Sequence, residues 1–543
     1  PAPVPCETTG YKPIPRALFV NAKSSPTSNS PDPTSLRATE VDVLLLLEGT
    51  FPYVSGGVSS WVNQIIRGFP NLRFGAIFLG SRPQDYGAMR YAPLPDNLVH
   101  LDVAYLYGER TAPPVRQVRA ASKTMDLVTK VHDDLLYNNL TPESALRFAS
   151  LMDEAHPCGM LSHDTFLYSE ESWEYIKKNY RKFSTDPSFV DYFWTIRTIH
   201  SPFWYLREVA ARAPNAKIYH SVSTGYAGIL GVLLKHRNKR PFMLSEHGIY
   251  VKERKIDLYQ AQWLKDNRGV FDKDPSRVSY FRQLWIRFFE HLGYMTYQAS
   301  DEIIALYEAN RIRQLQDGAP PERTCNIPNG IDIARFAPLR SQRSSEVPQI
   351  MCLIGRVVPI KDIKTYIRSM RIVVNSLPNA EAWIAGPEDE SPDYARECHE
   401  LVDQLGLKGK VKFLGFQKLT DLLAKVGLVV LSSISEALPL VILEGYAAGV
   451  PTLSTDVGSC KQLVFGLPGE DAALGASGRV VRIADPQALA DAAIELLSNP
   501  EIWHQASKAA IARVEKYYAQ EIMFSSYRDL YEKNFQKSKE WQA

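Results

Sequence analysis

Hydrophobic positions along the chain alternate between short continuous apolar runs and longer stretches with the spacing of amphipathic helices. The first run, residues 41–47, has the hydrophobicity of a strand buried on both faces of a parallel sheet. After Gly56 and Gly57, apolar residues recur every three or four positions as far as Phe69, and a second strand is predicted at residues 73–79. A strand, a glycine loop, a helix and a strand in this order predict a βαβ unit that opens a doubly wound sheet.

The same alternation continues through both halves of the chain and predicts an α/β protein with two Rossmann-like, doubly wound domains. Two such domains that face each other would hold a ligand in the cleft at the carboxyl ends of their strands. The later strands are predicted at residues 217–221, 241–245, 302–305 and 324–327 in the first half, and at residues 349–354, 382–385, 411–413, 428–431, 452–454 and 478–481 in the second.

Four segments are expected from this pattern, with a polar stretch of linker character at residues 337–348. Residues 1–39, rich in Pro, Ser and Thr, are expected to form a poorly ordered tail. The other three segments are an N-terminal domain at residues 40–340 with an aromatic helical insertion at about residues 105–210, a C-terminal domain at residues 341–520, and a helix at residues 521–543 that returns to the N-terminal domain.

The composition of the 543 residues narrows the class of protein. An apolar fraction of 45%, a charged fraction of 22% and a net charge of +2 are those of a soluble globular protein and give no reason to expect nucleic acid binding. The six cysteines are scattered, without the spacing of a zinc site or a disulfide framework. No apolar run is long enough to span a membrane, and the N-terminus lacks the order of a signal peptide, so a cytoplasmic protein is expected.

The most informative motif follows the strand at residues 428–431 and reads Ser435-Glu-Ala-Leu-Pro-Leu-Val-Ile-Leu-Glu444. Pro439 stands where the first helical residue is favoured, so Glu436 lies in the loop and Glu444 about a turn and a half into a helix. The free N–H groups at the start of that helix can bind an anion. A carboxylate on each side of the anion suits a ligand with hydroxyl groups on both sides of a diphosphate, such as a nucleoside diphosphate sugar.

Two cations follow the strand at residues 349–354. Arg356 comes directly after Gly355, and Lys361 lies five residues later. Both are predicted to face the same cleft, where they can neutralise a leaving pyrophosphate without a metal. Because no pair of aspartates lies at a strand end near these motifs, neither a metal nor another cofactor is expected. A third motif, Asn326-Ile-Pro-Asn-Gly-Ile-Asp332, predicts a turn at the domain junction.

In order and spacing these motifs resemble the retaining GT-B glycosyltransferases of family 4, over about residues 40–530. The segment Glu48–Trp61, the aromatic insertion and the sequence Ser245-Glu-His-Gly-Ile-Tyr250 are similar to the branch of that family that acts in Pel exopolysaccharide synthesis in bacteria. The resemblance implies the GT-B fold and the transfer of a hexosyl unit, with retention, from a UDP-sugar to a growing exopolysaccharide acceptor. On this account the leaving phosphate helps to deprotonate the incoming hydroxyl group.

The resemblance also assigns charged residues to the donor. Arg356 and Lys361 would bind the diphosphate, and Glu444 would bind the ribose. Glu436 would face the hydroxyl groups of the donor sugar. His247 matches the family histidine that approaches the sugar near its C6 hydroxyl, so His247, Arg356, Lys361 and Glu436 are the implied catalytic residues.

Backbone groups and glycines complete the implied donor site. Gly56 and Gly57 would let the N-terminal loop approach the phosphate and the acceptor, because glycine permits so close a backbone. The backbone that would cap the phosphates belongs to Leu438, Pro439, Leu440 and Val441.

Simpler interpretations stand beside these assignments. Arg356 and Lys361 would otherwise be solvated surface cations, His247 a structural histidine, and Gly56-Gly57 a tight turn. The rival functions are a GT-B-fold UDP-sugar epimerase and a nucleotide-binding, non-catalytic subunit of a polysaccharide synthase complex. A nicotinamide dehydrogenase is disfavoured, because no G-x-G-x-x-G motif follows the first strand of either half.

The sequence leaves two donors open, UDP-glucose and UDP-N-acetylhexosamine, and the acceptor is a sugar or a polysaccharide. Through other proteins the chain would reach the inner-membrane Pel synthesis and export complex, and would then be peripheral at that membrane.

Overall fold

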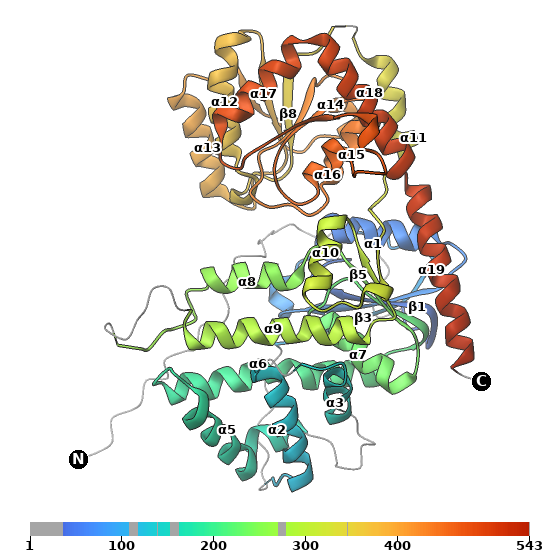
Figure 1. Ribbon diagram of the computed structural model, residues 1–543, viewed down its shortest axis with the longest axis vertical. Coiled ribbons are helices and arrows are strands. Elements are labelled where there is room, and N and C mark those ends of the chain that lie inside the picture. Colours follow the sequence, from blue (N-terminus) through green and yellow to red (C-terminus); the bar gives the residue numbers. More distant parts are fainter. Residues whose placement is uncertain are drawn as a thin grey trace. The chain divides into compact units, whose positions relative to one another are not determined.

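The computed structural model describes residues 36–107, 118–137, 140–152, 162–269, 278–344 and 346–541. Most of the expected tail at residues 1–39 therefore lies outside the described residues. Contacts divide the chain into two compact units (Figure 1). The first unit comprises Pro1–Ile303, Arg313–Thr324 and Lys533–Ala543, and the second comprises Ile304–Ile312 and Cys325–Glu532.

The N-terminal half is built on a seven-stranded sheet with the order β3-β2-β1-β4-β5-β6-β7. β1 pairs in parallel with β2 on one side and with β4 on the other, as the βαβ pattern predicts. Val43, Leu44, Leu45, Leu46 and Leu47 of β1 are fully buried, which explains the unbroken apolar run. The strands are β1 (Glu40–Glu48), β2 (Phe74–Gly80), β3 (Leu98–Tyr105), β4 (Asn215–Ser221), β5 (Phe242–Glu246), β6 (Glu302–Ala305) and β7 (Thr324–Asn326).

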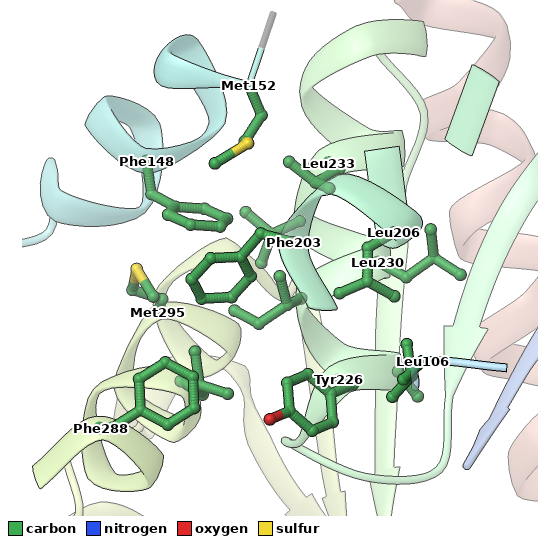
Figure 2. Packing of buried hydrophobic residues seen from close by; sticks show 14 of the residues in the cluster. Leu106, Phe148, Met152, Phe203, Leu206, Tyr226, Leu230, Leu233, Phe288 and Met295 are labelled. Carbon is green, nitrogen blue, oxygen red and sulfur yellow. The ribbon is translucent and has the colours of Figure 1, made fainter. Parts of the chain in front are cut away.

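Helices around this sheet share one hydrophobic core with it. α7 packs against β1 and β4, and α6 and α9 lie beside α7 (Figure 1). Figure 2 shows Phe148 of α3, Phe203 of α6, Leu230 of α7 and Phe288 of α9 gathered in that core. The helices are α1 (Gly57–Gly68), α2 (Ser122–Tyr137), α3 (Ser144–Leu151), α4 (His163–Tyr168), α5 (Glu170–Phe183), α6 (Phe189–Arg212), α7 (Tyr226–Asn238), α8 (Tyr250–Gln260), α9 (Tyr280–Ala299) and α10 (Glu308–Gln316).

The second unit contains a six-stranded sheet with the order β10-β9-β8-β11-β12-β13, and all of its pairings are parallel. Its strands are β8 (Ile350–Ile354), β9 (Glu381–Ala385), β10 (Val411–Phe413), β11 (Leu428–Leu431), β12 (Thr452–Thr455) and β13 (Gly478–Val481). Its helices are α11 (Ile333–Phe336), α12 (Ile363–Ser376), α13 (Pro392–Gln404), α14 (Leu419–Leu423), α15 (Leu440–Ala447), α16 (Cys460–Phe465), α17 (Pro486–Ser498) and α18 (Pro500–Tyr517), followed by α19 (Gln520–Glu540). Two parallel, doubly wound sheets confirm the predicted α/β class.

The last helix, α19, contributes to both units. In the second unit, Met523 accepts a hydrogen bond from the Gly330 backbone through its sulfur atom. From Lys533 onward the helix belongs to the first unit, where Arg240 donates to the backbone and the hydroxyl oxygen of Ser538 at 3.1 Å each. No helix among the described residues is long and apolar enough to cross a membrane.

Three features of the fold differ from the predicted pattern. β3 was not predicted, because it carries the polar residues His100 and Asp102, which are nevertheless buried. α9 was not predicted either, although its buried residues Phe281, Leu284, Trp285, Phe288, Phe289 and Leu292 recur at helical spacing. The linker expected at residues 337–348 is packed in its first part: Arg340 donates to the Ala447 carbonyl, and Arg343 donates to two carbonyls at 2.7 Å each.

A buried arginine on α18 holds in place the segment that leads into β13, the edge strand of the second sheet. Arg513 is fully buried, and its Nε donates to Asp471 at 2.6 Å. Its two terminal nitrogens donate to the carbonyls of Val464, Asp471 and Gly475 and to the Ser477 hydroxyl at 2.9–3.1 Å. All five N–H groups of the guanidinium are thus satisfied by one buried network.

We expect the substitution Arg513→Met to destabilise the second unit by about 3–5 kcal/mol, because it leaves the buried Asp471 carboxylate without its partner. Urea unfolding followed by circular dichroism would measure the change. The exposed Arg482, substituted in the same way, is the matched control and should stay within about 0.5 kcal/mol of the wild type. Equal midpoints for the two variants would contradict the role given to the network.

Candidate functional site

The loop after β8 carries two of the predicted cations. Gly355 has φ +159°, and a Cβ at this position would lie 3.4 Å from Cε of Lys361, so the lysine side chain passes directly over the glycine. A single 3₁₀ turn at Pro359–Lys361 leads into α12, whose first turn is capped by the Asp362 side chain. These contacts hold the start of the Lys361 side chain close to the carboxyl end of β8.

The loop after β11 binds back onto the loop after β8. The Ser432 hydroxyl donates to the Lys361 carbonyl, and the Ile434 backbone N–H donates to the Ile360 carbonyl, at 2.8 Å each. Lys361 Nζ then lies 2.6 Å from Glu436 Oε1. Sequence positions 75 residues apart therefore form one ion pair at the edge of the second sheet.

Glu436 shares one of its oxygen atoms between two donors. Oε1 also accepts a hydrogen bond of 2.6 Å from the Ser433 hydroxyl, a residue that the motif did not single out. Oε2 has no hydrogen bond to any residue in the described ranges and retains its acceptor capacity. The side chain is mostly buried, with 14% of it exposed.

The start of α15 lies next to this pair. Pro439 is its N-cap residue, and no side chain caps the first turn, so the N–H groups expected to bind phosphate are not occupied by a cap. Leu438 and Pro439 are buried, whereas Leu440 and Val441 are half-buried. These apolar contacts fix the position of the backbone from which the helix begins.

A glycine after β12 supports the same loop. Gly458 has φ +53°, and a Cβ there would come within 2.4 Å of the backbone oxygens of Glu436 and Ala437. The neighbouring Ser459 N–H donates to the Ala437 carbonyl at 2.9 Å. A left-handed glycine is therefore required at this close approach, and sequence reasoning missed it because the contact joins separate elements.

Glu444, on α15, is a predicted donor residue with a strongly shifted pKa. Burial raises the pKa of its carboxyl group to about 7, and the positive charge of Arg335 partly offsets this effect. The carboxylate forms no hydrogen bond or ion pair within the described part of the chain. A half-buried, unpaired acceptor of this kind suits a ligand that brings its own hydroxyl donors.

Arg356 does not contact Lys361 or Glu436. Its guanidinium instead forms an ion pair of 2.5 Å with Glu390, and half of the arginine side chain is exposed. To bind a diphosphate, Arg356 would have to exchange Glu390 for a phosphate oxygen. The structure therefore brings Lys361, Glu436 and the start of α15 together but leaves Arg356 paired with a different acid.

The remaining predicted residues lie in the first unit. His247 follows β5 and is buried against the Trp61 ring, with ring centroids 4.6 Å apart. Burial lowers the pKa of His247 to about 3, so the ring is neutral at pH 7. Its Nε2 atom is buried and has no partner among the described residues.

Gly56 and Gly57 begin α1 and are exposed. A Cβ at either position would meet no atom within 4 Å. Gly56 has φ 165°, an extended conformation that any residue adopts. Neither packing nor backbone strain inside the described structure requires glycine at these two positions.

A carboxylate cluster that the sequence motifs did not identify lies at the carboxyl ends of β1 and β5. Glu48 accepts hydrogen bonds from the Tyr250 hydroxyl at 2.8 Å and the Ala227 N–H at 3.2 Å. Glu246 is fully buried and accepts four hydrogen bonds, from Thr224, Tyr250, Tyr297 and Gln314. These bonds fix the turn that carries His247. In the described ranges, no group of three or more His, Cys, Asp or Glu residues is arranged to hold a metal ion.

Comparison with known families assigns both halves of the chain. Residues 41–322 match the family described as "Domain of unknown function (DUF3492)", and residues 338–513 match "Glycosyl transferases group 1". The second match contains Arg356, Lys361, Glu436 and Glu444.

Individual proteins are also similar to this chain, over less than half of its length. A D-inositol 3-phosphate glycosyltransferase of Streptomyces scabiei is 25% identical over 237 residues, which are 41% of this chain and 49% of that protein. An N-acetyl-alpha-D-glucosaminyl L-malate synthase of Bacillus anthracis is 29% identical over 188 residues, or 34% of this chain and 46% of that protein. The chain thus spans about half the length of the curated relatives it matches.

Among solved structures, Anabaena HepE in complex with UDP superposes with a TM-score of 0.53 and 15% identity, over 90% of this chain and 99% of that one. This likeness supports the GT-B fold. The chain belongs to the family of the DUF3492 domain, and its residues 338–513 match the model of the glycosyl transferases group 1 family.

Proposed function

We propose that the protein is a retaining, metal-independent glycosyltransferase that moves a hexosyl unit from a UDP-sugar to a saccharide acceptor. The observation that carries the proposal is the grouping of Lys361, Glu436 and the uncapped start of α15 at the carboxyl edge of one parallel sheet. The half-buried Glu444 lies on the same helix. A cation, an uncapped helix start and two carboxylates match the parts of a nucleoside diphosphate sugar.

Each charged group has a separate task in this proposal. Glu444 accepts hydrogen bonds from the ribose diol, and the N–H groups that follow Pro439 bind the diphosphate. Oε2 of Glu436, which has no partner in the described structure, accepts from a hydroxyl group of the donor sugar. Because Oε1 of Glu436 is already held by Lys361 and Ser433, the acid is oriented before the sugar arrives.

The transfer breaks the bond between the anomeric carbon and the β-phosphate oxygen of the donor. The same carbon forms a bond to the acceptor oxygen on the same face, and the acceptor proton passes to the leaving phosphate. Lys361 and Arg356 stabilise the charge that develops on the departing UDP, once Arg356 has exchanged Glu390 for the phosphate. The protein's contribution is mainly orientation and charge stabilisation.

The first unit would supply the acceptor side and one contact to the donor sugar. Nε2 of His247 has no partner in the described structure and can accept a hydrogen bond from the sugar's C6 hydroxyl group. Gly56 and Gly57, which nothing in the described packing requires, leave space for a ligand against the backbone. We assign the acceptor to a growing exopolysaccharide and the chain to the PelF branch, which acts with the inner-membrane Pel synthesis and export complex. The resemblance of residues 48–61 and 245–250 to that branch supports this assignment.

The class of nucleotide tests the proposal directly. We expect UDP to raise the unfolding temperature of the protein, and ADP and GDP to have no comparable effect, because only ligand bound to the native state stabilises it. Either UDP-glucose or UDP-N-acetylglucosamine, incubated with a polysaccharide acceptor and a chelator, should then release UDP. A change in the configuration of the sugar nucleotide without acceptor would instead identify an epimerase, and UDP binding without any turnover would indicate a non-catalytic subunit.

Removal of either donor cation should abolish transfer. We expect Lys361→Ala and Arg356→Ala each to lower kcat/KM by about 100-fold or more, since each removes charge stabilisation from the leaving diphosphate. The fold should persist, as judged by an unchanged unfolding temperature. Arg368→Ala, at an exposed position on α12, is the matched control and should retain full activity. Full activity in both cation variants would refute the assignment.

The pH dependence of UDP binding should report Glu444. Its pKa is raised to about 7, so the carboxyl group is protonated below pH 7 and becomes the better acceptor for the ribose diol above it. We expect the affinity for UDP to increase as the pH rises from 6 to 8. Titration calorimetry on wild type and Glu444→Gln separates this effect from the ionisation of UDP itself, because the variant keeps only the latter. Identical pH profiles for the two proteins would exclude Glu444 from the site.

A further inference from the structure

A cavity of the first unit lies beside the amino ends of β1 and β4. Its volume is about 410 Å³, within the range of about 300–1,000 Å³ that small-molecule pockets occupy. It is bounded by the segment that leads into β1, by two residues of β3, and by the segment that joins α6 to β4. The lining residues are Arg37, Ala38, Thr39, His100, Asp102, Arg212, Ala213, Pro214 and Asn215.

His100 lines this cavity and carries a buried acceptor. The side chain is 6% exposed, and Nδ1 lies 2.8 Å from the Ala38 carbonyl oxygen. Because a carbonyl oxygen only accepts, Nδ1 carries the proton, and Nε2 is left with a lone pair. Burial lowers the pKa of His100, which favours this neutral form. Nε2 is buried and has no partner in the described part of the chain.

Two arginines and one aspartate complete the polar lining. Arg212 Nε donates to Asp102 at 2.7 Å, and Arg37 lies 3.5 Å from the other oxygen of the same carboxylate. About half of each arginine side chain is exposed, whereas Asp102 is 8% exposed. The outer nitrogens of Arg212 have no other partner in the described structure. Two cations and one anion leave one net positive charge beside a neutral histidine, which suits an anionic ligand.

We propose that this cavity binds a small anionic sugar, with its carboxylate or phosphate between Arg37 and Arg212 and a hydroxyl group donating to His100 Nε2. Guanidinium groups present paired N–H donors that match both kinds of anion. Asp102 holds one edge of the Arg212 guanidinium and leaves its outer edge to the ligand. A sugar acid and a sugar phosphate share the required chemistry, an anion next to a free hydroxyl.

The cavity is separate from the proposed transfer site. Its residues lie in the segment before β1, at the junction of α6 and β4, and among the first five residues of β3, whereas Glu48, Glu246 and His247 lie at the carboxyl ends of β1 and β5. β1 has nine residues, so its two ends are about 25 Å apart. A ligand in this cavity would therefore bind at the same time as a donor, and its binding does not depend on transferase activity.

Titration calorimetry on the full chain would test the site with four probes: glucuronate, glucose 6-phosphate, glucose and inorganic phosphate. We expect at least one of the two anionic sugars to bind about tenfold or more tightly than glucose or phosphate, because only these carry both recognised groups. The tighter of the two identifies the source of the anion. Saturation with UDP should leave this affinity unchanged.

Two variants and a control assign the binding to the cavity. Arg37→Gln, and the double variant Arg212→Gln/Asp102→Asn, which removes both charges of the ion pair together, should each weaken binding about tenfold or more at an unchanged unfolding temperature. Arg181→Gln, at an exposed position on α5, should bind like the wild type. The proposal is overturned if neither anionic sugar binds at millimolar concentration, if both variants keep the wild-type affinity, or if UDP competes with the ligand.

Discussion

The parallel pairing of β8 with β11 determines where the chemistry of the second unit lies. Parallel strands send their carboxyl ends to the same edge of the sheet, so the loop with Lys361 and the loop with Glu436 emerge side by side. Hydrogen bonds from Ser432 and Ile434 then join the two loops, and the ion pair of 2.6 Å forms on that base. The start of α15 follows within a few residues of Glu436, which places the helix N–H groups at the same edge.

Each unit contains buried polar side chains that have hydrogen-bond partners and others that, within the described residues, have none. Around Arg513 and Glu246 the buried side chain has its hydrogen-bond partners, although burial still raises the pKa of Glu246 to about 7. Glu444 is partly desolvated without a partner among the described residues, and its pKa rises to about 7. His247 likewise has a buried nitrogen without a partner there, on a turn that Glu246 fixes. An unpaired buried polar group costs stability, which a ligand with complementary hydrogen bonds would recover.

The sequence by itself determined the elements whose pattern is local. Unbroken apolar runs predicted β1 and β11, because a strand that is buried on both faces consists of consecutive apolar residues. Prolines at the first helical positions predicted the starts of α17 and α18, because proline is favoured there. The spacing of Arg356, Lys361, Glu436 and Glu444 likewise indicated a donor site. Their roles remain predictions.

Only the tertiary structure decided which of these groups meet. The ion pair of Lys361 with Glu436 joins positions 75 residues apart, and that of Arg356 with Glu390 joins positions 34 apart. The local spacing of residues therefore predicts neither pair. The need for glycine at position 458 arises from a loop on another element, and β3 is a strand because neighbouring segments bury and pair its polar side chains. Pairing and burial between distant segments depend on the complete fold, which local sequence does not encode.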